Sequence, residues 1–284
     1  MIFNQNVDLP GFATFPLLES EAGRNRLVKS YQEQIDLARE FGCGTMLESA
    51  TWMANGDRAA PLGYNREQLA SANFAALKLL HQMASKNADV PLRISAQIGP
   101  RCDGYRPHMQ MDETEAERYH AIQMAQIAQG SPDIVSAFTM SYSEEVIGIV
   151  RAAQHHSLPI AISFTLETDG KLPTGMALGE AIERVDAVTN HYTDYFLINC
   201  AHPDHFMANL VDAPWIKRLK GVVVNASRCS HEELDAADQL DDGDPQELGE
   251  AIGHIKQRFP HFQIFGGCCG TDLRHMREMA QRLS

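Results

Sequence analysis

Short apolar runs alternate with helical patterns along the whole chain of 284 residues. A run of apolar and β-branched residues between turn residues predicts a buried strand, whereas apolar positions three or four residues apart predict a helix. We expect strands at Thr45–Glu48, Leu92–Ile98, 133–138, 159–164, Tyr195–Asn199, 221–224 and 262–265. We expect helices at 24–41, 65–85, Glu113–Ala128, 143–153, 178–189, 204–218, 245–258 and from Thr271 onward.

Helices between successive buried strands predict parallel strands joined by right-handed crossovers. Eight such units in a ring form a TIM barrel, and the expected strands fall one short at the N-terminus. We therefore predict an α/β fold of the TIM (β/α)8 type, in a single domain over residues 1–284, whose first strand is missing or improvised from residues 1–6. The alternative is an open doubly wound sheet, but the Gly-x-Gly-x-x-Gly turn that often marks that fold is absent from the sequence. An incomplete barrel exposes two sheet edges, which predicts a homo-oligomer.

Charge and hydropathy limit the kinds of molecule that the protein is expected to bind. The chain carries 37 acidic and 24 basic residues, a formal charge of −13, which argues against binding to nucleic acid or to an anionic membrane surface. No apolar run approaches the roughly 20 residues that cross a bilayer. The first residues show neither the basic nor the apolar region of a secretory signal. We therefore expect a cytoplasmic protein that acts on small molecules.

Three cysteines stand where expected strands end. Cys200 follows one strand, and Cys268 and Cys269 follow another after two glycines. Active sites of barrels lie at the carboxyl ends of the strands, so we expect the three thiols to meet at one rim. Three thiolate ligands with a fourth position open are typical of a catalytic zinc site. The alternatives are a Cys268–Cys269 disulfide, which would be strained and easily reduced in the cytosol, or two inert buried thiols.

Several other groups receive a structural interpretation. Six cysteines are too few for a disulfide scaffold, and we expect Cys43 and Cys229 to be buried as small apolar residues. His202 is either an extra metal ligand or an exposed loop residue, and we favour the loop. The acidic segment 231–250 is expected to be a solvated loop that leads into a helix begun by proline, rather than a cation site.

The cysteine motifs resemble those of a known family. The sequence Gly-Gly-Cys-Cys-Gly-Thr at 266–271, with Asn199-Cys200 upstream, is similar to the homocysteine S-methyltransferase family. Glu-Ser-Ala-Thr-Trp at 48–52 and Ile-Gly-Pro at 98–100 resemble the family's motifs after the second and third strands, and Gly-Glu at 179–180 lies in the expected helix. The resemblance covers essentially the whole chain and implies a zinc-dependent barrel whose zinc ligands here are Cys200, Cys268 and Cys269.

The resemblance also implies an activity and its site residues. The activity is methyl transfer to a thiol, with homocysteine as acceptor and a second small molecule as methyl donor. The zinc-bound acceptor thiolate would attack the methyl carbon, so no protein base is needed at the sulfur. The ring of Trp52 is expected to face a sulfonium or quaternary ammonium donor. The expected substrate-binding residues are Glu48, Trp52, Thr139, Asn199 and Gly267.

Two positions depart from the family pattern. The family's first strand ends in Asp-Gly-Gly, whereas nothing like it precedes Val7, so we expect the chain to begin after that strand. The family's glutamate after the fourth strand, which grips the substrate ammonium, corresponds here to Thr139. A neutral contact is weaker than a charge-assisted one, so we expect the metal site to survive better than the affinity for homocysteine. The alternative functions are a zinc-binding barrel that lacks methyltransferase activity and, ranked last, a redox role for the cysteine pair.

Overall fold

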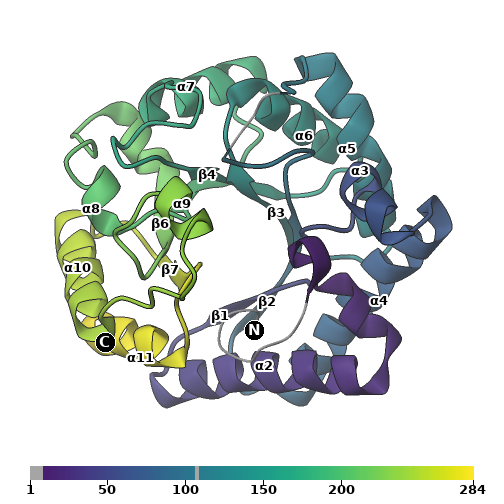
Figure 1. The fold of residues 1–284 in the computed structure, drawn as a ribbon, viewed down its shortest axis with the longest axis horizontal. Helices are drawn as coiled ribbons and strands as arrows, with labels where there is room; N and C mark the ends of the chain where they lie inside the picture. Colours follow the sequence, from purple (N-terminus) through teal and green to yellow (C-terminus); the bar gives the residue numbers. More distant parts are fainter. Residues whose placement is uncertain (1–8, 106–108) are drawn as a thin grey trace. The chain divides into compact units, whose positions relative to one another are not determined.

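Seven strands in one sheet form the framework of the fold (Figure 1). The computed structural model describes residues 9–105 and 109–284. The strands follow one another in chain order: β1 (Thr45–Glu48), β2 (Leu92–Ile98), β3 (Ile134–Met140), β4 (Ile160–Thr165), β5 (Tyr195–Asn199), β6 (Leu219–Val224) and β7 (Ile264–Gly267). The pairings β1–β2, β2–β3, β5–β6 and β6–β7 are parallel.

This strand order decides between the two predicted architectures. A doubly wound sheet reverses its strand order at a switch point, whereas the order here runs from β1 to β7 without reversal. The fold is therefore of the α/β TIM type with an incomplete first strand, as predicted. The expectation that residues 1–6 improvise the first strand lies outside the described residues, and the single domain over 1–284 stays a prediction.

Helices follow the strands and cover the sheet (Figure 1). The α-helices are α2 (Glu21–Glu40), α3 (Gly56–Ala59), α4 (Arg66–Lys86), α5 (Glu113–Ala128), α6 (Ser143–His155), α7 (Leu178–Val188), α8 (Pro203–Phe206), α9 (His231–Asp235), α10 (Pro245–Arg258) and α11 (Leu273–Leu283). The described residues also form the 3-10 turns η1 (Pro10–Phe12), η2 (Phe15–Glu19), η3 (Ala60–Leu62) and η4 (Pro214–Arg218). None of the helices in the described part of the chain combines the length and apolar character needed to cross a membrane.

Two compact units make up the chain. The first consists of the described residues up to Cys102 together with Met109–Phe138 and Glu144–Ala161. Its helices begin at side-chain caps, such as the capping box in which Asn65 and Gln68 bond each other's backbone N–H groups at the start of α4. Its apolar side chains meet in a core, whose fully buried members include Leu27, Ile35, Leu47, Leu77 and Leu80.

The second unit contains the described residues of 103–108, Thr139–Ser143 and Ile162–Ser284. Phe164 and Phe196 stack in its core with ring centroids 6.1 Å apart. Burying a large apolar side chain contributes about 1.5–3 kcal/mol relative to leaving it exposed. These rings therefore help to hold β4 and β5 together, the two strands that lead into the loops described below.

Two predicted elements differ from the structure. The helix expected at 204–218 is replaced by α8 and η4, because Pro214 has no N–H for a continuing helix and holds Ala213 in extended backbone. The last strand spans Ile264–Gly267 rather than 262–265, so that Gly266 and Gly267, which were expected to follow the strand, belong to it.

For three residues, the prediction of whether the side chain is buried or exposed was wrong. Cys43 is exposed because it lies in the turn between α2 and β1. Cys229 is half-buried in the loop before α9, where its N–H donates to Ser227. His202 is buried rather than exposed, because its Nδ1 accepts from the N–H of Asp204 and caps α8.

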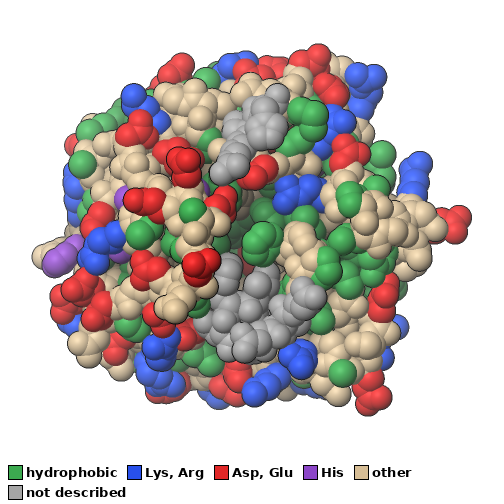
Figure 2. All heavy atoms as spheres, viewed as in Figure 1, with side chains coloured by type: hydrophobic (Ala, Val, Ile, Leu, Met, Phe, Trp, Pro, Cys, Tyr) green, Lys and Arg blue, Asp and Glu red, His purple; other side chains and the backbone are tan. Residues whose placement is uncertain are grey.

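The acidic segment 231–250 is partly helical. It begins with the short helix α9, whose Ser230–Glu233 capping box was not expected, and α10 starts at Pro245 as predicted. The residues between the two helices are mostly exposed, and acidic side chains gather over this segment (Figure 2). Most of the segment is therefore solvated, as the sequence indicated.

The first testable prediction concerns Gly221, which pairs with Ile264 across β6 and β7. A Cβ atom at Gly221 would collide with the carbonyl oxygen of Ile264. We expect Gly221→Ala to lower the free energy of unfolding by about 1–3 kcal/mol, measured by urea denaturation, because the two strands would have to separate. Gly56→Ala is the control, since nothing lies within 4 Å of its added Cβ. Equal stability of the two variants would contradict the close approach of β6 and β7.

Candidate metal centre

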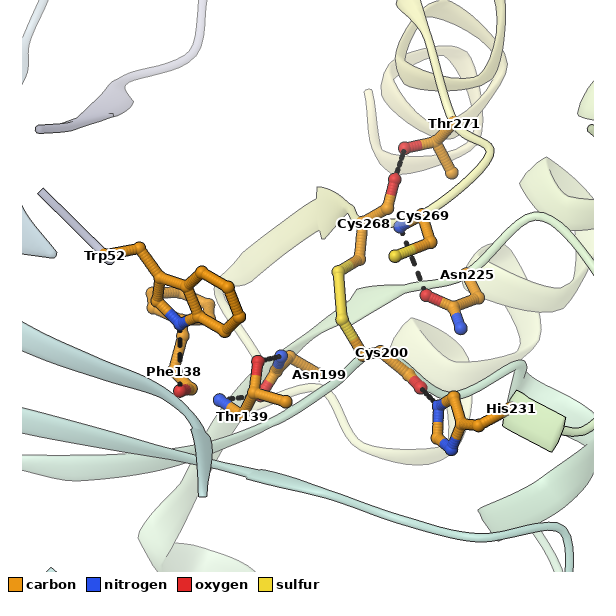
Figure 3. The surroundings of a disulfide bond; sticks show 10 residues. All are labelled: Trp52, Phe138, Thr139, Asn199, Cys200, Asn225, His231, Cys268, Cys269 and Thr271. Atoms are coloured by element: carbon orange, nitrogen blue, oxygen red, sulfur yellow. Dashed lines mark hydrogen bonds between the residues drawn. A yellow bond between two sulfur atoms is a disulfide. The ribbon is translucent and has the colours of Figure 1, made fainter. Parts of the chain in front are cut away.

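Three cysteine side chains converge at the carboxyl ends of β5 and β7. Cys200 follows the last residue of β5, and Cys268 and Cys269 follow the last residue of β7. Their three sulfur atoms all lie within 4.8 Å of one another (Figure 3). Cys200 is buried, and the other two are half-buried. The predicted meeting of three thiols at one rim is confirmed.

The end of β6 holds both cysteine segments, because β6 lies between β5 and β7 in the sheet. The N–H of Cys200 donates to the carbonyl of Val223 at 3.0 Å, and the N–H of Cys268 donates to the carbonyl of Val224 at 2.7 Å. The N–H of Cys269 donates to Oδ1 of Asn225 at 3.2 Å (Figure 3). Three consecutive residues of one segment therefore set the positions of all three cysteines.

Local backbone conformation also brings the thiols together. Cys200 has a φ of 53°, in the left-handed region that residues other than glycine seldom adopt. Gly267 packs directly against Thr271, whose hydroxyl donates to the carbonyl of Cys268 at 2.7 Å. A side chain at Gly267 would displace that hydroxyl. Close packing against Thr271 therefore explains why a glycine stands at this position. Its predicted contact with substrate stays a prediction.

The sulfur atoms of Cys200 and Cys268 are joined by a disulfide, and Cys269 is a free thiol (Figure 3). The alternative of a disulfide between the neighbours Cys268 and Cys269 is wrong, because the fold brings the sulfur atoms that follow β5 and β7 together from segments 68 residues apart. Burial raises the pKa of the Cys269 thiol.

The donor set fits a soft metal ion. Three thiols within reach of one point are the ligands that zinc prefers, and a fourth position is left for a further ligand. A buried thiol with a raised pKa is largely protonated at neutral pH, so a bound cation is what would hold Cys269 as a thiolate. Elsewhere in the described ranges, no other group of three His, Cys, Asp or Glu side chains converges in this way.

Two further residues beside this centre were missed by sequence reasoning. The Nε2 atom of His231 lies 2.7 Å from the carbonyl oxygen of Cys200. The ring of Tyr105 packs against that of His231 with centroids 3.8 Å apart. Burial raises the pKa of Tyr105, and the next cause is the nearby Cys269. Tyr105 lies in a loop and His231 at the start of α9, and neither belongs to a motif that would have indicated its place beside the cysteines.

Thr139 and Asn199 form a reciprocal pair. The backbone N–H of Thr139 donates to Oδ1 of Asn199 at 3.0 Å, and Nδ2 of Asn199 donates to the Thr139 hydroxyl at 2.9 Å (Figure 3). Both side chains are buried. Gly104 lies so close to Thr139 that a Cβ there would approach its Cγ2 to 2.7 Å. The position beside Cys200 is therefore polar but uncharged.

Glu48 and Trp52 belong to the first unit. Burial raises the pKa of Glu48 to about 7, partly offset by hydrogen bonds from Ser95 and Ser136. Its Oε2 is buried without a hydrogen-bond partner among the described residues. The indole N–H of Trp52 donates to the carbonyl of Phe138 at 3.3 Å, and the Arg58 guanidinium lies 5.4 Å from its ring centre. One face of Trp52 is thus already covered by a cation.

The second testable prediction follows from the pKa of Glu48. The unfolded chain releases this proton near its ordinary value of 4.5, whereas the folded chain keeps it up to about 7. The folded state therefore binds more protons over this interval, and the free energy of unfolding falls as pH rises through it. Relative to Glu48→Gln, we expect the wild-type protein to lose about 1–3 kcal/mol between about pH 5 and about pH 8, in urea titrations. Parallel pH profiles of the two proteins would contradict the raised pKa.

Solved structures with a similar fold come from a bacterial methyltransferase. The oxidized form of the homocysteine methyltransferase MmuM from Escherichia coli matches with a TM-score of 0.74 at 16% identity, over 98% of this chain and 91% of that chain. The metallated form matches with a TM-score of 0.72 at 15% identity, over the same shares of 98% and 91%. The apo form gives 0.62 at 16% identity, over 90% and 84%. At these identities, the likeness shows the fold alone.

Comparison with families is more specific. A family model described as homocysteine S-methyltransferase matches residues 40–283, which include all three cysteines of the centre. No curated protein sequence gave a significant match. Because the family match extends over most of the chain, this protein belongs to the homocysteine S-methyltransferase family and is an S-methyltransferase.

Proposed function

We propose that this chain catalyses zinc-dependent methyl transfer to a thiol, with homocysteine as the acceptor. The observation that carries the proposal is the convergence of three sulfur atoms within 4.8 Å of one another in a chain of this family. The metallated form of a protein with a similar fold gives independent support. The partners are thus small molecules, namely a thiol and a methyl donor.

Cys200, Cys268 and Cys269 are the proposed zinc ligands, and the open fourth position takes the acceptor sulfur. Bound zinc would lower the pKa of the acceptor thiol, so that a thiolate is present at neutral pH. The chain's own contribution is to fix the ligand positions through the end of β6. Because β6 holds both ligand segments, the centre needs little rearrangement to bind a metal once it is reduced.

Thr139 and Asn199 are proposed to orient the acceptor beside Cys200. The two residues already hydrogen-bond each other, so a substrate ammonium beside them would meet only neutral oxygen atoms. A neutral hydrogen bond contributes about 0.5–1.5 kcal/mol, less than a bond to a charged group. We therefore propose that homocysteine is bound chiefly through its sulfur.

Glu48, Trp52 and Gly267 are proposed to contact substrate as well. A carboxyl group with a pKa of about 7 is largely protonated in mildly acidic solution and is then able to donate a hydrogen bond. Trp52 is proposed to receive a cationic methyl donor on the ring face opposite Arg58. Gly267 would allow a ligand to approach the backbone, since it has no side chain.

The third testable prediction is metal binding. We expect the reduced protein to bind one zinc ion, measured by elemental analysis after removal of free metal. Cys268→Ser and Cys200→Ser should weaken binding sharply, because each removes one of three thiolate ligands. Cys43→Ser is the matched control and should bind as the wild type does, since Cys43 is exposed and lies in the first unit. Full zinc occupancy in a Cys268→Ser Cys269→Ser variant would contradict the assignment of ligands.

The fourth testable prediction concerns the acceptor. The zinc-loaded protein should form thioether from homocysteine with at least one of a sulfonium, a betaine or a methylfolate donor. It should accept 4-mercaptobutanoate, which is homocysteine without its amino group, with a kcat/KM no more than about tenfold lower, because only a neutral contact is lost. A kcat/KM for homocysteine more than about a hundredfold above that for 4-mercaptobutanoate would show that a charged group binds the ammonium. Failure with every donor and thiol would favour the non-enzymatic alternative.

A further inference from the structure

His231 is the first residue of α9, in the acidic segment to which the sequence assigned no function. Its side chain is only 13% exposed. Its Nε2 atom lies 2.7 Å from the carbonyl oxygen of Cys200, and its Nδ1 atom lies 3.5 Å from a carboxylate oxygen of Glu167. A carbonyl oxygen only accepts, so Nε2 carries the hydrogen and donates to Cys200.

The stacked ring of Tyr105 keeps His231 in this orientation. The two ring centroids are 3.8 Å apart, with planes tilted by 33°. The imidazole is thus held on one face by Tyr105 and at Nε2 by the carbonyl of Cys200, the residue that follows β5. A side chain fixed in this way is able to fix the group that it bonds.

Cys200 is the cysteine that most needs such support, because its φ of 53° is in the left-handed region. Conformations of this kind persist only where the surroundings determine them. The N–H of Cys200 donates to the carbonyl of Val223. The carbonyl of Cys200 accepts from His231, as Figure 3 shows. With both backbone groups bonded, the direction of the Cα–Cβ bond of Cys200 is set, so that its sulfur has only the few rotamers about χ1 to choose from.

We propose that His231 is a positioning residue of the cysteine centre, which holds the Cys200 sulfur beside those of Cys268 and Cys269 by donating to the Cys200 carbonyl. The inference rests on the proposed function in so far as the centre binds zinc. It extends that function by including α9 in the metal site. A purely structural role for His231 would be to anchor α9 through its contact with Tyr105.

Two substitutions separate the bond from the ring packing. His231→Phe keeps an aromatic ring against Tyr105 and removes the donor, whereas His231→Gln keeps an N–H donor and removes the ring. We expect His231→Phe to weaken zinc binding by about 10- to 100-fold, as is typical when a residue that orients a ligand is lost. His231→Gln should bind zinc nearly as the wild type does. The dissociation constants are measured on reduced protein by competition with a coloured chelator.

His261→Phe is the matched control, because Nε2 of His261 also bonds a backbone carbonyl, that of Ile216, at 2.9 Å. This variant should bind zinc with the wild-type affinity. Thermal unfolding of all variants reports whether each one folds. Wild-type affinity in His231→Phe would overturn the proposal. Equal losses in His231→Phe and His231→Gln would also overturn it, since ring packing would then be the cause.

A second measurement needs no metal. In a Cys269→Ser background, diamide takes two electrons and two protons from Cys200 and Cys268 as their disulfide forms, and peptide mapping follows its rate. His231→Phe should slow this reaction, because the Cys200 sulfur would spend less time beside Cys268, and an unchanged rate would count against the proposal. If the wild type bound no zinc, the proposed function would fail, and the rate would still decide whether His231 positions Cys200.

Discussion

The cysteine centre depends on the hydrogen bonds made by the end of β6. β5 and β7 are not neighbours in the sheet, because β6 lies between them. The cysteines that follow β5 and β7 therefore meet beside the end of β6. Val223, Val224 and Asn225 bond the N–H groups of Cys200, Cys268 and Cys269 in turn. The spacing of the three thiols is therefore set by one short segment of parallel sheet. Close packing of β6 on β7 at Gly221 also helps to set this spacing.

Beside Cys200, the side chains of Thr139 and Asn199 are polar and uncharged, whereas a carboxylate, that of Glu167, lies near His231. Thr139 and Asn199 satisfy each other, and His231 uses Nε2 on a backbone carbonyl. The proposed metal ligation and the proposed acceptor recognition thus rest on different kinds of interaction. The proposed metal site uses cysteines held by backbone hydrogen bonds, whereas the proposed recognition of the amino-acid end uses neutral hydrogen bonds. Such a division lets a chain retain its metal site while its choice of acceptor changes.

Much of the fold could be predicted from the sequence, because buried parallel strands appear as short apolar runs between amphipathic helices. The meeting of the three cysteines followed from their place at strand ends. The break at Pro214 was missed because the apolar spacing continues past it, and the burial of His202 was missed because capping is set by local backbone geometry. His231 could not be found from the sequence, since its contacts with Cys200 and Tyr105 join segments far apart in the chain and follow no motif.

The central claim is that three thiolates of this chain and the sulfur of the acceptor share one zinc ion. X-ray absorption at the zinc edge tests it most directly, on reduced, zinc-loaded protein with and without homocysteine. The account predicts three sulfur neighbours and one lighter neighbour, oxygen or nitrogen, without the thiol, and four sulfur neighbours with it. Fewer than three sulfur neighbours, or a sulfur count that homocysteine leaves unchanged, would contradict the account.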